Sequence, residues 1–100
     1  MIRGTTPTHE FSLPCDASII KEVMIIYAQN DVEVFHKDTE KCTLDGEKVI
    51  VTLSQEDTFK FDHKSKVQIQ LRVLTNDGTS LASDIKVIPV KKCLNDEVLA

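Results

Sequence analysis

Strict alternation of apolar and polar side chains marks residues 67–73 as the clearest element of the chain. Val67, Ile69, Leu71 and Val73 occupy every second position, with polar side chains between them. Successive side chains of a strand point to opposite faces, whereas a helix would scatter these residues around its circumference. The spacing therefore predicts a β-strand with one apolar face.

Similar but shorter patterns surround this strand. Apolar or β-branched residues are concentrated in segments 11–13, 23–28, 32–37, 49–53 and 81–90. Turn-forming residues separate several of them, at Gln29-Asn30-Asp31, Asp45-Gly46 and Asn76-Asp77-Gly78. We expect a type I′ hairpin turn at Asp45-Gly46. Alternation predicts one shared face for Val32, Val34 and His36, and another for Leu81, Ile85 and Val87.

Residues 54–59 have the pattern of a helical turn, because Ser54 can cap its first N–H groups. About seven short strands predict an all-β fold, an immunoglobulin-like antiparallel β-sandwich with one short helical turn. The 100 residues contain no Trp, so the Trp-on-disulfide centre of immunoglobulin domains is absent. We expect a single domain, residues 1–100, with flexible arms at about 1–7 and 91–100.

Composition limits the partners. Sixteen acidic residues against twelve basic ones give a net charge of −4, which disfavours a sequence-independent grip on nucleic-acid phosphates. The longest apolar run, residues 23–28, is far shorter than the roughly twenty residues of a membrane helix. We expect neither a nucleic-acid nor a membrane partner.

Cys15, Cys42 and Cys93 are odd in number and widely spaced, which indicates reduced thiols in a cytoplasm; one disulfide plus a spare thiol is the alternative.

Residues that could carry chemistry are dispersed. The chain has no Gly-x-Ser-x-Gly, no phosphate-binding Gly-rich loop and no His-Glu-x-x-His, and its three histidines lie far apart. His36 near Asp38 could be a base and its orienting group, but a strand residue with a solvated tip is the simpler interpretation. We therefore expect no catalytic, metal-binding or cofactor-binding residue.

Segment 23–28 is unusual because both of its faces are apolar. A strand in a two-layer sandwich needs only one apolar face. Either a loop or a terminal arm covers the other face, or another subunit contacts it. Ile88 and Val90 are expected to lie opposite the main apolar face of their own strand. The candidate interaction surface therefore consists of Met24, Ile26, Ile88 and Val90.

Four stretches resemble small proteins encoded in phage and prophage structural gene clusters of Gram-positive bacteria. They are Arg3-Gly4-Thr5-Thr6-Pro7-Thr8 with Phe11-x-Leu13-Pro14, Thr52-Leu53-Ser54-Gln55-Glu56-Asp57-Thr58, Gln70-Leu71-Arg72-Val73-Leu74-Thr75, and Gly78 followed by Leu81-Ala82-Ser83-Asp84-Ile85. The resemblance spans roughly residues 3–90. It implies a virion-associated β-sandwich at the tail or a tail-tip appendage, made in the bacterial cytoplasm and then built into the particle.

The expected function is a non-catalytic structural or protein-interaction module. Its partners would be other virion or tail proteins, or copies of itself in a homo-oligomer. The alternative is an adhesion or carbohydrate-binding β-sandwich. A small enzyme is a third hypothesis, disfavoured because no catalytic constellation is recognisable.

Overall fold

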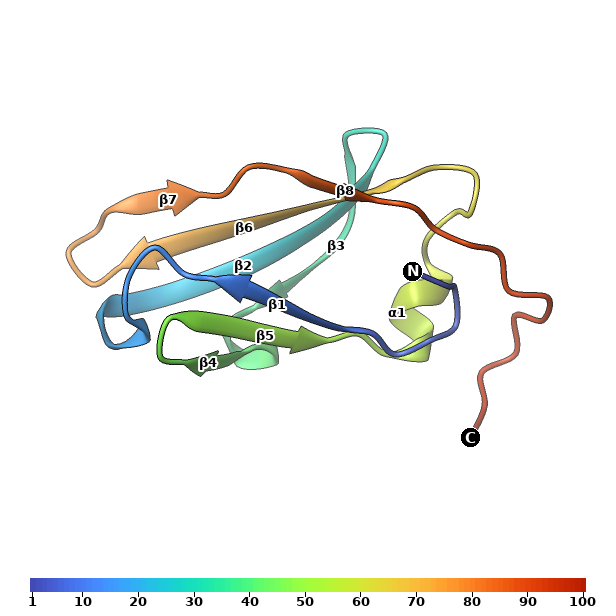
Figure 1. Ribbon diagram of the computed structural model, residues 1–100, viewed down its shortest axis with the longest axis horizontal. Coiled ribbons are helices and arrows are strands. Elements are labelled where there is room, and N and C mark those ends of the chain that lie inside the picture. Colours follow the sequence, from blue (N-terminus) through green and yellow to red (C-terminus); the bar gives the residue numbers. More distant parts are fainter.

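A computed structural model describes all residues 1–100 and confirms an all-β sandwich of two antiparallel sheets (Figure 1). Its eight strands are β1 (Thr8–Ser12), β2 (Ile20–Gln29), β3 (Val32–Asp38), β4 (Thr43–Asp45), β5 (Lys48–Thr52), β6 (Val67–Thr75), β7 (Ser80–Ala82) and β8 (Lys86–Ile88). One short helix, α1 (Gln55–Phe59), and two 3-10 turns, η1 (Ala17–Ile19) and η2 (Thr39–Lys41), complete the chain. No helix has the length and apolar character needed to cross a membrane.

The two sheets differ in size. The smaller sheet has the order β1-β5-β4. In the larger sheet the order is β3-β2-β6, and β7 and β8 pair in succession with the far edge of β6. The long strands β2 and β6 run side by side along the molecule, and both chain termini lie toward the end that carries α1 (Figure 1).

The core lies between the sheets and contains the side chains that the alternation predicted. Val67, Ile69, Leu71 and Val73 on β6 are all buried, as are alternate residues of β2. Fourteen buried apolar residues form one cluster. Aromatic rings close it toward the α1 end, where Tyr27 stacks on Phe35 with ring centroids 5.0 Å apart.

A β-bulge in β3 changes which of its side chains face the core. Phe35 lies opposite Tyr27 and Glu33 opposite Ala28, so Val34 is an extra residue without a partner on β2. Val34 and Phe35 consequently both pack against the core. The predicted shared face of Val32, Val34 and His36 is therefore wrong, and His36 lies on the opposite face with Glu33.

Segment 81–90 is not one strand but two, and the pairing register shifts by one residue between them. On β7 Val73 lies opposite Leu81, whereas on β8 Val67 lies opposite Ile88. Because side chains alternate with a period of two, a shift of one residue exchanges the faces. Ile88 therefore packs against the core and Val87 points outward, so the predicted shared face of Leu81 and Val87 is also wrong.

Local turns and caps follow the residue types at these positions. Asn30 and Asp31 both have positive φ, as a two-residue hairpin turn between β2 and β3 requires. At the β4–β5 hairpin only Gly46 has positive φ and the turn residues are 46–47, which corrects the expected type I′ turn. Ser54 and Asp57 form a capping box that begins α1, as the sequence indicated for Ser54.

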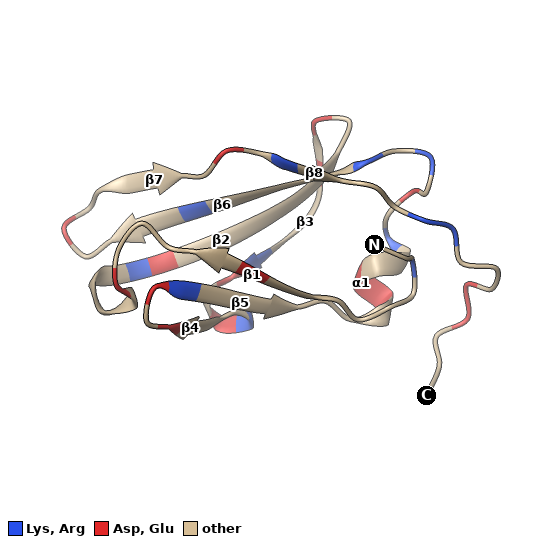
Figure 2. Ribbon diagram, viewed as in Figure 1, with Lys and Arg blue, Asp and Glu red and all other residues tan.

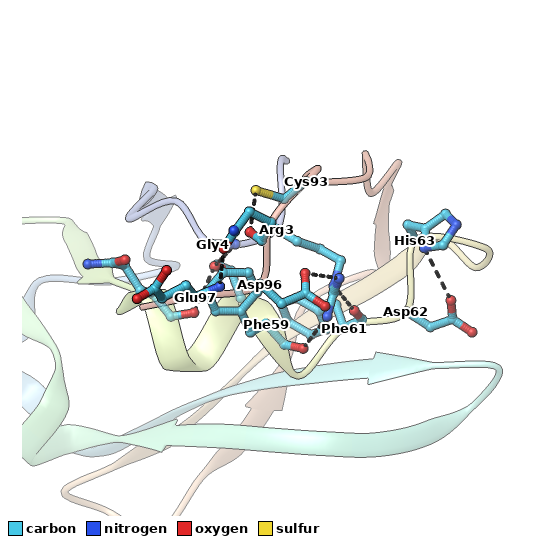
Figure 3. A network of polar contacts seen from close by, with 12 residues as sticks. Arg3, Gly4, Phe59, Phe61, Asp62, His63, Cys93, Asp96 and Glu97 are labelled. Atoms are coloured by element: carbon cyan, nitrogen blue, oxygen red, sulfur yellow. Dashed lines mark hydrogen bonds and ion pairs between the residues drawn. The ribbon is translucent and has the colours of Figure 1, made fainter. Parts of the chain in front are cut away.

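The N-terminal segment is held by specific contacts. The backbone N–H of Arg3 donates to Lys91 at 3.1 Å, and its guanidinium donates to the carbonyls of Phe59 and Phe61 and to Asp96 (Figure 3). Near the other terminus the side chain of Gln55 exchanges two hydrogen bonds with the backbone of Leu99. Both terminal segments thus lie against α1 and the residues that follow it.

Candidate interaction surface

The structure brings together two of the four predicted surface residues. Met24 and Ile26 lie on the outer face of β2, half-buried, while their neighbours Val23 and Ile25 are in the core. Ile88 and Val90 are excluded, because Val90 is only 8% exposed and both pack with the core cluster. The register shift between β7 and β8 is the physical reason for this correction.

Sequence reasoning missed several residues of the same face. Directly opposed residues of antiparallel strands share a face. The residues of β3 and β6 that pair with Met24, Ile26 and Ala28 therefore form a column of side chains on each side of β2. The β3 column consists of Glu33, His36 and Asp38. On the other side of β2, the column of β6 consists of Gln68, Gln70, Arg72 and the half-buried Leu74. We call this face, with Met24, Ile26 and Ala28 along its centre, the outer face of the larger sheet.

Apolar side chains continue beyond β6. Ile85 and Val87 are 53% and 54% exposed, and Val87 lies opposite Gln68 on the outer face. Charge is sparse along the two central strands: Lys21 and Glu22 begin β2, and Arg72 is the single charged residue of β6 (Figure 2). The outer face thus has an apolar centre with polar and charged columns on each side.

Two shallow grooves mark this face. The larger, of about 390 Å³, surrounds Met24 and has Asp38 and Arg72 among its lining residues. The smaller, of about 170 Å³, lies beside Ala28 and is lined by Ile26, Ile85 and polar residues. The half-buried Ile26 lies in the row between those of Met24 and Ala28.

The hydrogen bonds of the terminal segments lie away from the outer face. The terminal segments make their contacts with α1, residues 59–61 and residues 89–91. A third depression, of about 310 Å³, lies elsewhere, at the open seam between the end of β1 and β7, and is lined by Leu13, Leu71 and Leu81 among others.

The charges of the outer face are only partly paired. His36 Nδ1 lies 3.2 Å from a carboxylate oxygen of Glu33, an i,i+3 contact that the bulge in β3 makes possible. Asp38 and Arg72 are exposed, and their side chains have no hydrogen-bond or ion-pair partner within the chain. His36 is exposed, and its polar partner is Glu33 rather than Asp38.

Two contacts between partly or largely buried ionisable side chains lie on the inner side of the larger sheet instead. Lys37 forms an ion pair of 2.8 Å with Asp57, and the two side chains are only 19% and 10% exposed. Burial raises the pKa of Asp57, but hydrogen bonds from Lys37 and Ser54 outweigh it and leave the pKa below its usual value. Burial likewise raises the pKa of Tyr27, whose hydroxyl lies 2.7 Å from Nδ1 of His9. These contacts join β1, β2, β3 and α1.

Comparisons of the chain with protein-family models, with curated protein sequences and with solved structures found no significant match.

Proposed function

We propose that the chain is a non-catalytic protein-interaction module of a phage or prophage particle, at the tail or tail tip. It would be made in the bacterial cytoplasm and would dock through the outer face of the larger sheet. The observation that carries the docking role is the apolar centre of that face, Met24, Ile26 and Ala28; the terminal segments make their hydrogen bonds elsewhere. The assignment to a particle rests on the sequence resemblance.

Burial of this apolar centre would supply the binding energy. Uncovered apolar area on one face is typical of protein contact sites. Each Å² of apolar surface removed from water contributes about 25 cal/mol. Burial of the exposed part of even one isoleucine would therefore contribute appreciably to the binding free energy of a weak interface. The flanking polar columns suit the rim of such an interface, which stays accessible to water.

A protein partner ranks above a glycan because of where the aromatic side chains lie. Tyr27 and Phe61 are buried, and Phe11, Phe35 and Phe59 are half-buried. Carbohydrate-binding faces generally present exposed aromatic rings, and none of these five side chains is exposed. A clear hit for the purified protein on a glycan array would reverse this ranking.

The experiment compares Ile26→Lys with Ile50→Lys in particles induced from a bacterium that encodes the chain. Ile50 is the matched control, because it is also a half-buried isoleucine on an outer face, that of the smaller sheet between buried Val49 and Val51. Quantitative mass spectrometry of purified particles should find the wild type and Ile50→Lys incorporated, and Ile26→Lys depleted at least tenfold. Absence of the wild-type chain from the particles would refute the particle assignment. Equal incorporation of both variants would refute the role of the outer face.

A further inference from the structure

We propose that the outer face of the larger sheet binds a second copy of this chain, related by a two-fold axis along β2. In this dimer Asp38 of each copy lies opposite Arg72 of the other. The inference rests on the proposed function and deepens it by naming the partner and its orientation.

An acidic and a basic side chain lie on the two sides of Met24 in one row across the sheet. Met24 lies opposite Asp38 on β3 and opposite Arg72 on β6, so the three side chains point from the same face. Neighbouring strands are about 4.8 Å apart, which places the acid and the base roughly 10 Å from each other on the sheet. Neither side chain has a partner within the chain. The face thus presents a negative group on one side of its apolar centre and a positive group on the other.

A two-fold axis along β2 brings opposite charges of the two copies together. Rotation by 180° about a line along β2 exchanges the β3 side of one copy with the β6 side of the other. Asp38 of each copy then meets Arg72 of its partner, which gives two ion pairs on either side of an apolar seam. Along that seam the Met24 side chains meet each other, as do the Ile26 side chains. Met24 is flexible enough to fill the grooves that surround it.

The possible two-fold axes differ in whether like charges of the two copies face each other. An in-plane axis perpendicular to β2 and centred on Ile26 would place Asp38 opposite the partner's Glu33, and like charges would face each other. The axis along β2 avoids this contact. It brings together only the two Glu22 side chains, which are exposed at the rim, where water and salt screen them.

The area that the two faces can bury limits the affinity of the dimer. Under this axis only β3, β2 and β6 face strands of the partner, because β7 and β8 lie beyond β6 while β3 is an edge strand. Three strands about 4.8 Å apart, paired over about nine residues at 3.3 Å each, give a footprint of roughly 430 Å² per copy. A standard stable interface buries about 800 Å² per partner. The footprint is about half of this, so we expect a weak, reversible dimer with a dissociation constant of roughly 10 µM to 1 mM.

Charge reversal tests this arrangement directly. Asp38→Arg and Arg72→Asp each place like charges opposite each other in their own homodimers, so each variant alone should dimerise at least tenfold more weakly than the wild type. An equimolar mixture of the two variants restores opposite charges at both contacts. Sedimentation velocity of the mixture should therefore recover dimer, with an affinity within threefold of the wild type.

Matched controls have the same changes in net charge away from the outer face. Glu47→Arg and Lys92→Asp alter exposed side chains, and they should dimerise as the wild type does, alone or mixed. Circular dichroism checks that every variant is folded.

Three results would overturn the dimer: a wild type that stays monomeric at about 1 mM, single variants that associate like the wild type, or a mixture that stays monomeric. If Ile26→Lys still abolishes incorporation into particles, the proposed function survives the failure of this inference. If Ile26→Lys is incorporated normally, the proposed function fails by itself.

Discussion

The ion pair between Lys37 and Asp57 gives the most specific prediction of stability. Its atoms are 2.8 Å apart, it joins β3 to α1, and both side chains are largely buried. Asp57 also accepts a hydrogen bond from the backbone N–H of Ser54 at 2.9 Å. Asp57→Asn retains a side-chain oxygen for the cap but leaves the Lys37 ammonium without an anion.

The magnitude follows from the burial of the lysine. Removing one partner of a fully buried pair costs about 3–5 kcal/mol, because the remaining charge stays uncompensated. Lys37 is 19% exposed, so its ammonium can turn partly toward water and the cost is reduced. We expect Asp57→Asn to lower the free energy of unfolding by about 2–3 kcal/mol. Glu56→Gln removes an exposed carboxylate from the same turn and should change it by less than about 0.5 kcal/mol.

Urea unfolding followed by the fluorescence of Tyr27, the only tyrosine, measures both variants. The double variant Lys37→Met, Asp57→Asn should lose less stability than the sum of the two single variants, because the second change removes a charge that is already unpaired. The folded-state pKa of Asp57 lies below its unfolded value. The stabilisation is therefore present above about pH 4 and is lost as the pH falls through the folded-state pKa. Equal stability of Asp57→Asn and Glu56→Gln would show that the ion pair does not stabilise the fold.

Two further predictions concern the N-terminal segment and β1. Gly4→Ala should destabilise the fold by about 1–3 kcal/mol in urea unfolding, because φ is +80° and a Cβ would lie 2.5 Å from the ring of Phe59. Gly78 also has positive φ but open space around it, so Gly78→Ala should destabilise the fold less. A larger loss of stability for Gly78→Ala would contradict the role of the close contact with Phe59. Burial, and then the charged N-terminus, lower the pKa of His9. The unfolded chain therefore takes up the proton first, and stability falls as the pH drops below about 6.5. His9→Gln should weaken this dependence between pH 7 and 5; an unchanged slope would show that His9 is not the group responsible.

The sequence predicted the strands well where their signals are local. Alternation at 67–73 identified the core face of β6, and Ser54 identified the start of α1, because both depend on residues close together in the chain. The double apolar face of segment 23–28 likewise predicted an unusual outer surface, and Met24 and Ile26 lie there.

Shifts in register could not be predicted in the same way. A single extra residue in β3, and a shift of one residue between β7 and β8, exchanged the faces of His36, Val87 and Ile88. At the second site, Ser83 takes part in the pairing through its side chain, whose Oγ accepts from the N–H of Leu71 at 3.0 Å. Ser83-Asp84 in the middle of an apolar segment was the only signal of this break.

The charged groups of the proposed dimer were not identifiable from the sequence. Asp38 and Arg72 lie 34 positions apart and share a row only because each pairs with Met24. Their relation depends on the register of three strands, which local patterns do not specify.

Methyl NMR measures whether the outer face of the larger sheet binds a second copy of this chain. Spectra of a protein labelled at Met and Ile methyl groups are recorded over a dilution series from about 1 mM to 10 µM, a range chosen to cross the expected dissociation constant. We predict that the resonances of Met24 and Ile26 shift with concentration while that of Ile50 on the smaller sheet does not. Shifts confined to Ile50, or none at Met24 and Ile26, would contradict it.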